Sequence, residues 1–483
     1  MTKQERKRRD RGAQFIRNNL ELLGFGNPRD ALVQAAKELF ENAWDATRSL
    51  NVESSWNDVP LKLLRLDVKL NRDTGNVDIL CADTGSGMHA HEVKLLCCNV
   101  FETTKVNREG GGGCNSGKYG VGLKAAMLYS QLQSSDACLK LVTTSNSDGI
   151  LYVQLCIDPD SEETAVVKKV AHFVVDEDHQ QFSGTEMRLS VPCPRDTLEL
   201  ISAADTLALY FQSLRYIAPP FVGVQFNFDV KEISTSVECL HGEEPIDRFV
   251  ADLGESADDI LYAVHDEEFF SISCVALMLG EVEIGVESDM EVCLLRFANH
   301  APLINDEDFF VCGTTKGVCT AKLWKKYGLR CHRTSSYLMN QLVASPLRAA
   351  SRHDDGNVEP ARLVLAIDVC VIGSSADTGI KYGGLKKSTL DACYTDGVQT
   401  CCRAILQQLA EAGRLCTPQQ RQDHDLIDNY APMIAKSLAK ITRQSQLRRC
   451  GGIMSSQQLE RNPQDHINEG LILHELQAAM RNW

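Results

Sequence analysis

Three short segments near the start of the chain constrain its fold more than any other feature. In order they read Glu38-Leu-Phe-Glu-Asn-Ala-Trp-Asp-Ala, Asp83-Thr-Gly-Ser-Gly and Gly117-Lys-Tyr-Gly-Val-Gly-Leu-Lys. The first lies in a helical pattern, the second follows an apolar strand-like run, and the third precedes another helical pattern. Each is common by itself, so the interpretation depends on finding all three together.

The first segment predicts a helix with a polar face. Apolar residues recur at helical spacing over residues 28–50, with Pro28 early and Asp30 suited to capping. Glu38, Asn42 and Asp45 are spaced i, i+4, i+7 and therefore share one side of this helix. Such a trio alone is more often a solvated face than a site.

The second segment places a carboxylate in a glycine turn. Residues 77–82 form an apolar strand pattern that leads directly into Asp83. This carboxylate could accept a hydrogen bond from an exocyclic amine such as adenine N6. Gly85 and Gly87 would let the backbone pass close to a flat ring.

The third segment resembles a P-loop only superficially. Residues 112–118 fit G-x-x-x-x-G-K, but Tyr119 replaces the Ser or Thr that contacts magnesium, and no buried strand precedes the glycines. We expect instead a mobile glycine lid, with backbone N–H groups reaching phosphates at the start of a helix over residues 123–132, where Lys124 adds charge. Together, the three segments predict ATP binding and hydrolysis without a P-loop.

The rest of the chain predicts further domains, as expected for 483 residues. Strand patterns at residues 61–70, 139–144, 150–157, 166–175, 185–191 and 222–230, with a helix at 198–216, complete the first domain. A second α/β region follows, with strands near residues 272–279, 292–298 and 362–372. The last hundred residues indicate helices, for example at 389–412 and 425–442, with a loose segment at 443–463.

Composition limits the partners and the compartment. A net charge of −15 argues against a surface that coats nucleic acid throughout. Two basic stretches depart from this balance, at residues 3–11 and 436–449. Either stretch could simply be solubilising charge. Alternatively, the first is a nuclear-import or dimer-contacting arm, and the second contacts DNA or a partner. No apolar run approaches the roughly 20 residues of a membrane span, so no membrane is expected. The nineteen cysteines include no C-x-x-C pair, which favours a reducing, intracellular location.

The three segments carry a family resemblance. Their order is similar to the ATPase fold shared by gyrase, the heat-shock chaperone, histidine kinases and MutL, and resembles in particular the B subunit of DNA topoisomerase VI. The similarity is strong over residues 12–131, moderate over 292–330, and poor elsewhere. The resemblance implies an α+β or α/β fold: a GHKL (Bergerat) ATPase sandwich, a transducer domain of the ribosomal-protein-S5-like type, and a C-terminal helical region. The implied ranges are a basic arm at 1–15, the ATPase domain at 16–235, the transducer at 236–385 and partner-contacting helices at 386–483.

The resemblance also assigns roles to residues. Glu38 would be the general base, Asn42 a Mg²⁺ ligand and Asp83 the adenine reader, while Lys325 would reach the γ-phosphate from the transducer. The full set expected to bind ATP is Asn42, Asp45, Asp83, Gly85, Gly87, Thr104, Lys105, Gly117, Lys118, Tyr119, Gly120, Val121, Gly122, Leu123, Lys124, Thr185 and Lys325. The implied cofactors are ATP and Mg²⁺.

The implied activity is that of an ATP-hydrolysing B subunit of a type IIB DNA topoisomerase. Two copies would dimerise as an ATP-gated clamp, in a heterotetramer whose A subunit cleaves double-stranded DNA, and the expected location is the nucleus. The chain lacks room for the helix–two-turns–helix domain that archaeal B subunits carry after residue 230. It is therefore also similar to meiotic B-like partners of the transesterase that makes double-strand breaks, and a scaffold role without ATP turnover stays open. A chaperone, kinase or mismatch-repair ATPase would share the first domain but should lack Trp324-Lys-Lys-Tyr-Gly.

Overall fold

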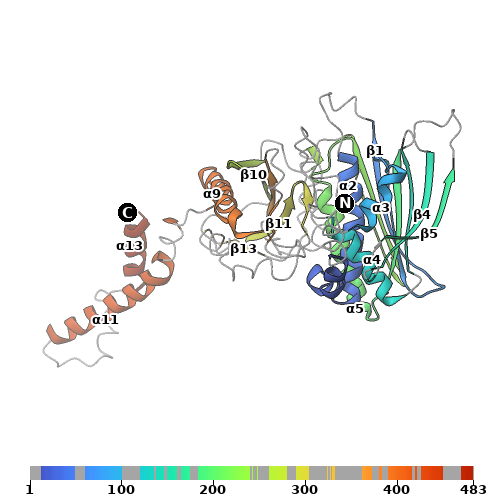
Figure 1. The fold of residues 1–483 in the computed structure, drawn as a ribbon. Helices are drawn as coiled ribbons and strands as arrows, with labels where there is room; N and C mark the ends of the chain where they lie inside the picture. Colours follow the sequence, from blue (N-terminus) through green and yellow to red (C-terminus); the bar gives the residue numbers. More distant parts are fainter. Residues whose placement is uncertain are drawn as a thin grey trace.

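The structure is a computed structural model and describes the following residues: 12–48, 60–99, 120–134, 137–145, 149–158, 160, 165–173, 183–239, 242, 247–248, 260–279, 290–303, 324, 327, 329–331, 362–372, 380–382, 390–415, 419–420, 426–449 and 469–481. Two β-sheets, each with its own helices, organise this part of the chain (Figure 1).

The first sheet has eight strands in the order β5-β4-β3-β6-β2-β1-β7-β8. The strands are β1 (Lys62–Leu70), β2 (Val77–Asp83), β3 (Leu139–Ser145), β4 (Gly149–Ile157), β5 (Ala165–Phe173), β6 (Gly184–Val191), β7 (Val222–Val230) and β8 (Ile233–Cys239). β1 and β7 are parallel, and the other neighbours in this sheet are antiparallel. β8 was not expected from the sequence, and it carries the first sheet through Cys239.

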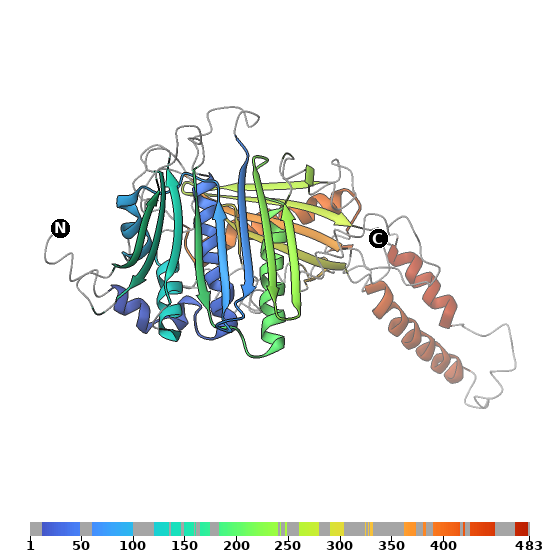
Figure 2. The ribbon, with the colours of Figure 1, turned by 90° about the vertical axis from the view of Figure 1, so that its right-hand side faces the viewer.

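One face of this sheet is covered by helices, and Figure 2 views the sheet from its other face. The helices are α2 (Pro28–Arg48), α3 (Ala90–Cys98), α4 (Gly122–Gln133) and α5 (Thr197–Leu214), with a short 3-10 turn, η1 (Glu21–Leu23), before them. Their apolar side chains and those of the facing strand positions form one continuous core.

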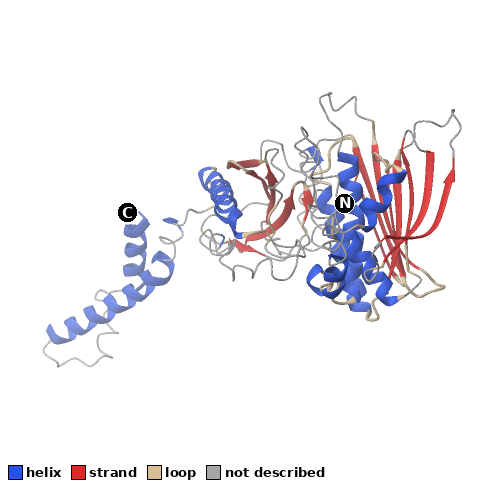
Figure 3. Ribbon diagram, viewed as in Figure 1, coloured by secondary structure: helices blue, strands red, loops and turns tan. Residues whose placement is uncertain are grey.

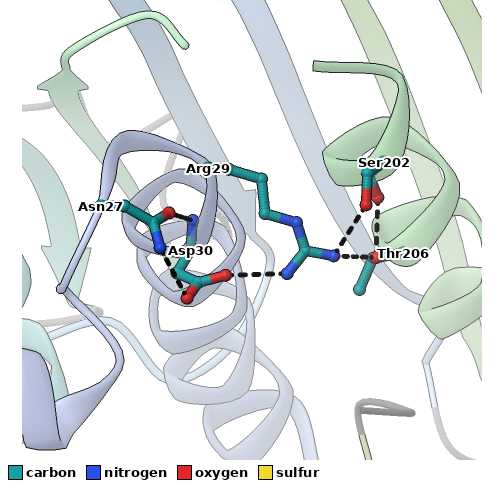
Figure 4. A network of polar contacts seen from close by, with 5 residues as sticks. All are labelled: Asn27, Arg29, Asp30, Ser202 and Thr206. Carbon is teal, nitrogen blue, oxygen red and sulfur yellow. Dashed lines mark hydrogen bonds and ion pairs between the residues drawn. The ribbon is translucent and has the colours of Figure 1, made fainter. Parts of the chain in front are cut away.

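The start of α2 differs from the expected capping. The capping side chain is Asn27 rather than Asp30: Asn27 Oδ1 accepts the hydrogen bond of Asp30 N, in the first turn of the helix, at 2.8 Å. Asp30 instead accepts from the Arg29 guanidinium at 2.8 Å. Arg29 also donates to Ser202 and Thr206 of α5 at 3.2 and 2.7 Å, which ties the two helices together (Figure 4).

The second sheet has the order β12-β11-β14-β10-β9, with β13 paired to β11. Its strands are β9 (Leu261–Asp266), β10 (Phe270–Leu279), β11 (Met290–Ala298), β12 (Ala301–Pro302), β13 (Leu329–Cys331) and β14 (Arg362–Val371). The 3-10 turn η8 (Ala392–Tyr394) and helix α9 (Thr395–Glu411) pack on one face, and the other face meets α5 of the first region (Figure 3). β9 was not expected, whereas β10, β11 and β14 were.

The C-terminal helices form a pair that projects from the second sheet (Figures 1 and 2). The π-helical turn η9 (Leu426–Tyr430) leads into α11 (Ala431–Arg449), which packs against α13 (Glu469–Arg481). α11 continues to Arg449, so the beginning of the segment expected to be loose is helical. None of the helices in the described ranges combines the length and the apolar character that crossing a membrane requires.

The mixed α/β fold class expected from the sequence is confirmed. Helices and strands alternate through the first region, and large sheets carry both parts of the structure.

Candidate nucleotide-binding site

Glu38, Asn42 and Asp45 form a polar stripe along α2, and this stripe meets the start of α4. A Cβ atom built on Gly122 would lie 1.8 Å from Glu38 Oε2, a separation that no side chain permits. Glycine at this position therefore lets the amino end of α4 lie directly against the carboxylate. Two of the three sequence segments are adjacent in space.

Glu38 is buried, with 6% of its surface exposed. Gln34, one turn earlier on α2, donates its Nε2 hydrogen to Glu38 Oε1 at 2.8 Å. This neutral amide fixes the orientation of the carboxylate without neutralising its charge. A fixed, buried carboxylate beside a glycine-lined helix start has the properties of a general base.

Asn42 and Asp45 follow Glu38 on the same side of α2. Asn42 is half-buried and donates its Nδ2 hydrogen to the Glu38 carbonyl at 2.8 Å. That bond uses the amide nitrogen and leaves Oδ1, an oxygen of the kind that Mg²⁺ prefers. Asp45 is 5% exposed and so lies within the protein interior.

Asp83 is the last residue of β2 and is 7% exposed. It pairs across the sheet with Leu64 of β1 and Thr185 of β6, and its Oδ1 accepts from Gly85 N at 2.8 Å. Burial raises the pKa of Asp83 to about 7, although backbone hydrogen bonds from Gly85 and Thr185 and the charge of Lys62 act in the opposite direction. The ionised form of a buried carboxyl whose charge is only partly compensated would be stabilised by one more hydrogen-bond donor.

The glycines after Asp83 are required by packing within the protein. Gly87 has φ +65°, and a Cβ there would lie 1.8 Å from Thr144 O of β3. A Cβ on Gly85 would meet Asp83 Oδ1 at 2.7 Å and Ala46 of α2 at 3.1 Å. The D-x-G-x-G turn is therefore wedged between α2 and β3, which holds Asp83 in place.

A hydroxyl cluster beside this turn was missed by the sequence analysis. Thr143 Oγ1 accepts from Met88 N at 2.9 Å, lies 3.1 Å from Thr185 Oγ1, and lies 3.2 Å from Gly184 O. Ser183 Oγ donates to Gly85 O at 2.7 Å. Thr185 was expected at the site, and the structure brings it next to Asp83. The available signal was a threonine at the end of an apolar strand, which is too common to be diagnostic.

The amino end of α4 has the features of an anion site. Gly120 has φ +57°, and the N-cap residue Val121 makes no side-chain cap hydrogen bond, so the cap residue itself does not occupy the first helical N–H groups. Leu123 is 5% exposed and belongs to the apolar core, so only its backbone could face a ligand. Lys124 is 3% exposed, and its charge partly offsets the burial that raises the pKa of Cys97 to about 11.

Several expected site residues lie outside the described ranges. They are Thr104, Lys105, Gly117, Lys118, Tyr119 and Lys325. Trp324, which precedes Lys325, is 1% exposed and packs in the core of the second sheet with Leu294 and Leu329.

Behind the stripe, α2 buries an ion pair that the sequence did not suggest. Lys37 Nζ lies 3.3 Å from Glu41 Oε1, with the two side chains 1% and 7% exposed. Tyr210 of α5 donates to the same oxygen at 3.5 Å. Burial, together with the charges of Glu41, Asp45 and Glu38, raises the pKa of Tyr210 well above its ordinary value. The stripe is thus connected electrostatically to α5.

The donor set fits a nucleotide with a hard divalent cation. Asn42 offers an amide oxygen, Glu38 a buried carboxylate, Asp83 a carboxyl suited to an amine donor, and α4 a helix amino terminus. Gly122 is needed for this arrangement, because the Cβ of any other residue would collide with the Glu38 carboxylate where α4 approaches it.

Two curated proteins illustrate the sequence similarity of this chain. The B subunit of type 2 DNA topoisomerase 6 from Pyrobaculum aerophilum is 31% identical over 157 residues, which is 32% of this chain and 28% of the relative. The equivalent protein from Saccharolobus islandicus is 32% identical over 181 residues, covering 37% of this chain and 31% of the relative. The similarity therefore spans less than a third of these relatives' length. No family model matches the chain.

Solved structures that align with this chain are more distant in sequence. The ATPase region of Saccharomyces cerevisiae topoisomerase II aligns with a TM-score of 0.40 at 12% identity, covering 78% of this chain and 82% of that one. The N-terminal domain of a DNA repair protein gives the same TM-score and identity, covering 95% of its own length. Such values are too low to support an assignment of function.

Proposed function

We propose that this chain, which is homologous over about a third of its length to topoisomerase 6 B subunits, binds and hydrolyses ATP as the B-type subunit of a type IIB DNA topoisomerase-like complex. The observation that carries the proposal is the contact between the Glu38 carboxylate and Gly122, because it joins a candidate base to a candidate phosphate cradle.

The described residues divide the chemistry among them. Glu38 orients a water and accepts its proton at Oε2, and Gln34 keeps the carboxylate in place. Asn42 Oδ1 and the N–H groups at the start of α4 hold the cation and the phosphates, and Asp83 accepts from the adenine amine. Mg²⁺, when bound, supplies neutralisation of phosphate charge. In this proposal Thr104, Lys105, Lys118 and Lys325 complete the site.

The proposal extends to the assembly. Two copies would close as an ATP-gated clamp, with an A-type partner cleaving double-stranded DNA in a nuclear heterotetramer. ATP must then bind the closed dimer more tightly than the open one. The partial similarity to B subunits is the support for this step.

The alternative is a meiotic B-like partner of a break-making transesterase, acting as a scaffold. The observation that favours it is the segment between β7 and β11: β8 completes the first sheet, and β9 and β10 belong to the second. Within residues 231–289, the described strands take up 233–239, 261–266 and 270–279, and a stretch of this length is short for an inserted helix–two-turns–helix domain as well.

ATP turnover by the purified chain distinguishes the ATP-hydrolysing subunit from the scaffold. We expect Glu38→Gln to lower turnover by about 10²–10⁴-fold while nucleotide affinity changes little. Glu186→Gln, an exposed carboxylate on β6, is the matched control and should retain full activity. Turnover that Glu38→Gln leaves intact would remove the hydrolytic proposal, and nucleotide binding without any turnover would favour the scaffold.

The assembly is tested separately. Co-purification with an A-type transesterase from the same cell, followed by relaxation and decatenation assays with ATP, should yield strand passage. A complex that cuts DNA without changing its linking number would favour the meiotic alternative.

A further inference from the structure

Three side chains of different chemistry converge at one end of the second sheet. They are His300, in the turn between β11 and β12, and Asp368 and Cys370, on β14. Their nitrogen, oxygen and sulfur atoms all lie within 4.8 Å of one another. Within the described ranges, this is the one group of three or more such residues close enough to share a metal ion.

The fold places these residues together by strand periodicity and a tight turn. Asp368 and Cys370 are two residues apart on β14 and so point to the same side of the sheet. This is the side on which Val364 packs with Leu209 of α5. His300 reaches them because β11 and β14 are parallel neighbours, with Phe297 opposite Asp368.

The turn that carries His300 is held in an uncommon conformation. Asn299 and His300 have φ values of +51° and +58°, which non-glycine residues seldom adopt. Asn299 N donates to Val369 O at 2.9 Å, and Asn299 Oδ1 accepts from Val371 N at 3.0 Å. His300 N also donates to Asp368 Oδ1 at 3.2 Å. These bonds fasten the turn to β14 and set the position of the imidazole.

The geometry suits coordination better than nucleophilic catalysis. Cys370 Sγ lies 3.6 Å from both ring nitrogens of His300, so it is not aligned with either one as a base would require. Cys370 Sγ also lies 3.2 Å from Asp368 Oδ2, which itself contacts His300 Nδ1. The distances from Cys370 Sγ, 3.6 Å to the ring nitrogens and 3.2 Å to the carboxylate, match those between ligands about 2.0–2.3 Å from one tetrahedral Zn²⁺.

We propose that His300, Asp368 and Cys370 bind a zinc ion. Histidine, thiolate and carboxylate together match the ligand preferences of Zn²⁺. The His300 side chain is 41% exposed, so the fourth position opens to solvent, whereas Asp368 is 7% exposed. Bound zinc would join the β11–β12 turn to β14, beside the place where β12 contacts α5. The site is independent of nucleotide hydrolysis.

Metal binding by the full-length chain tests this site. After removal of metal with a chelator, Co²⁺ should bind with a thiolate-to-cobalt charge-transfer band and tetrahedral d–d bands, and Zn²⁺ should displace it. Cys370→Ser should abolish the charge-transfer band, and His300→Asn, which tolerates the positive φ, should weaken binding by more than tenfold. Cys393→Ser, at an exposed cysteine, is the matched control and should leave the spectrum unchanged.

A positioning variant distinguishes a built site from a chance cluster. Asn299→Gly accepts the positive φ but removes the bond to Val371 N, and should weaken Co²⁺ binding by about 10–100-fold. Circular dichroism establishes that each variant is folded. Absence of a cobalt spectrum in the wild type, or a spectrum that survives Cys370→Ser, would overturn the proposal.

Discussion

The two sheets of this protein bury their side chains in different ways. The first is covered by helices on one face, and β2 alternates accordingly: Val77, Ile79 and Cys81 are buried, while the residues between them are half-buried. The second is covered on both faces, and Leu363, Val364 and Leu365 are all at most 1% exposed. One-sided burial gives alternating strands, and two-sided burial gives continuous apolar runs.

The helices that cover the two sheets also differ in which side chains they bury. α2 buries ionisable side chains at Lys37, Glu38, Glu41 and Asp45, whereas α9 buries mainly apolar ones such as Ile405 and Leu406. Burying charge is costly unless it is paired or used. The burial of ionisable side chains on α2 is therefore expected to lower stability in favour of a site, whereas α9 contributes apolar packing.

The largest effect on stability is expected from breaking the buried ion pair of α2. Lys37→Met leaves Glu41 buried without its cation and should lower the free energy of unfolding by about 3–5 kcal/mol, measured by urea denaturation. The double variant Lys37→Met/Glu41→Leu removes both charges and should recover most of this loss. A single variant as stable as the wild type would show that α2 does not depend on the pair.

The next effect tests the difference in burial between the sheets. Leu294 and Leu295 are neighbours on β11 that face α9 and α5 respectively. Replacing either by Ala should cost about 2–5 kcal/mol, because both faces are packed.

On β2 the corresponding pair should behave unequally. Ile79→Ala should cost a similar amount, whereas Leu80→Ala, on the open face, should cost under about 1 kcal/mol. Thermal or urea unfolding of the four variants provides the measurement. A small loss for Leu295→Ala would mean that the contact with α5 is loose and that the second sheet is effectively one-sided.

These differences also explain what the sequence could predict. The apolar runs of β10, β11 and β14 and the periodicity of α2 identified these elements, because their patterns are local. β8 and β9 were missed: β9 has only Ala263 buried, so its pattern is weak. Glu38, Asn42 and Asp83 were assigned to the site through motif order, and these assignments stay predictions. The contacts of Thr143 and the burial of the Lys37–Glu41 pair depend on packing between elements that no local pattern records.

Two buried aspartates extend the comparison to electrostatics. Burial raises the pKa of Asp83 to about 7, because it outweighs the backbone hydrogen bonds from Gly85 and Thr185 and the charge of Lys62. For Asp368, burial acts in the same direction, but the hydrogen bond and charge of His300 outweigh it, and its pKa is lowered. His300 therefore compensates the charge of Asp368 within the protein, whereas the charge of Asp83 is compensated only in part.

Nucleotide affinity should therefore depend on the ionisation of Asp83. The ionised fraction of Asp83 increases steeply between pH 6 and pH 8. ADP should therefore bind about tenfold more tightly at pH 8 than at pH 6, which corresponds to about 1.4 kcal/mol of binding free energy. Isothermal titration calorimetry across this range is the measurement. Asp83→Asn should bind more weakly and lose this pH dependence; a variant that retains it would place the titration elsewhere.

The same shift has a consequence for folding. Because the native pKa of Asp83 is higher than the unfolded value, the native state holds the proton more tightly from about pH 4 to pH 7. The wild type should lose stability as the pH rises through this window, whereas Asp83→Asn should not.

A small effect is also expected in α5, the helix that packs against both sheets. Asp196 caps its amino end by accepting from Leu198 N at 3.1 Å, so Asp196→Ala should cost about 1 kcal/mol, and Asp196→Asn should cost little. The loss should stay small because Arg29 holds Ser202 and Thr206 further along the helix, and Leu209, near its other end, contacts the second sheet. Differential scanning calorimetry resolves a change of this size. A decrease well beyond 1 kcal/mol for Asp196→Ala would mean that loss of the cap also loosens the contact of α5 with the second sheet, and that the two regions are less separate than their packing indicates.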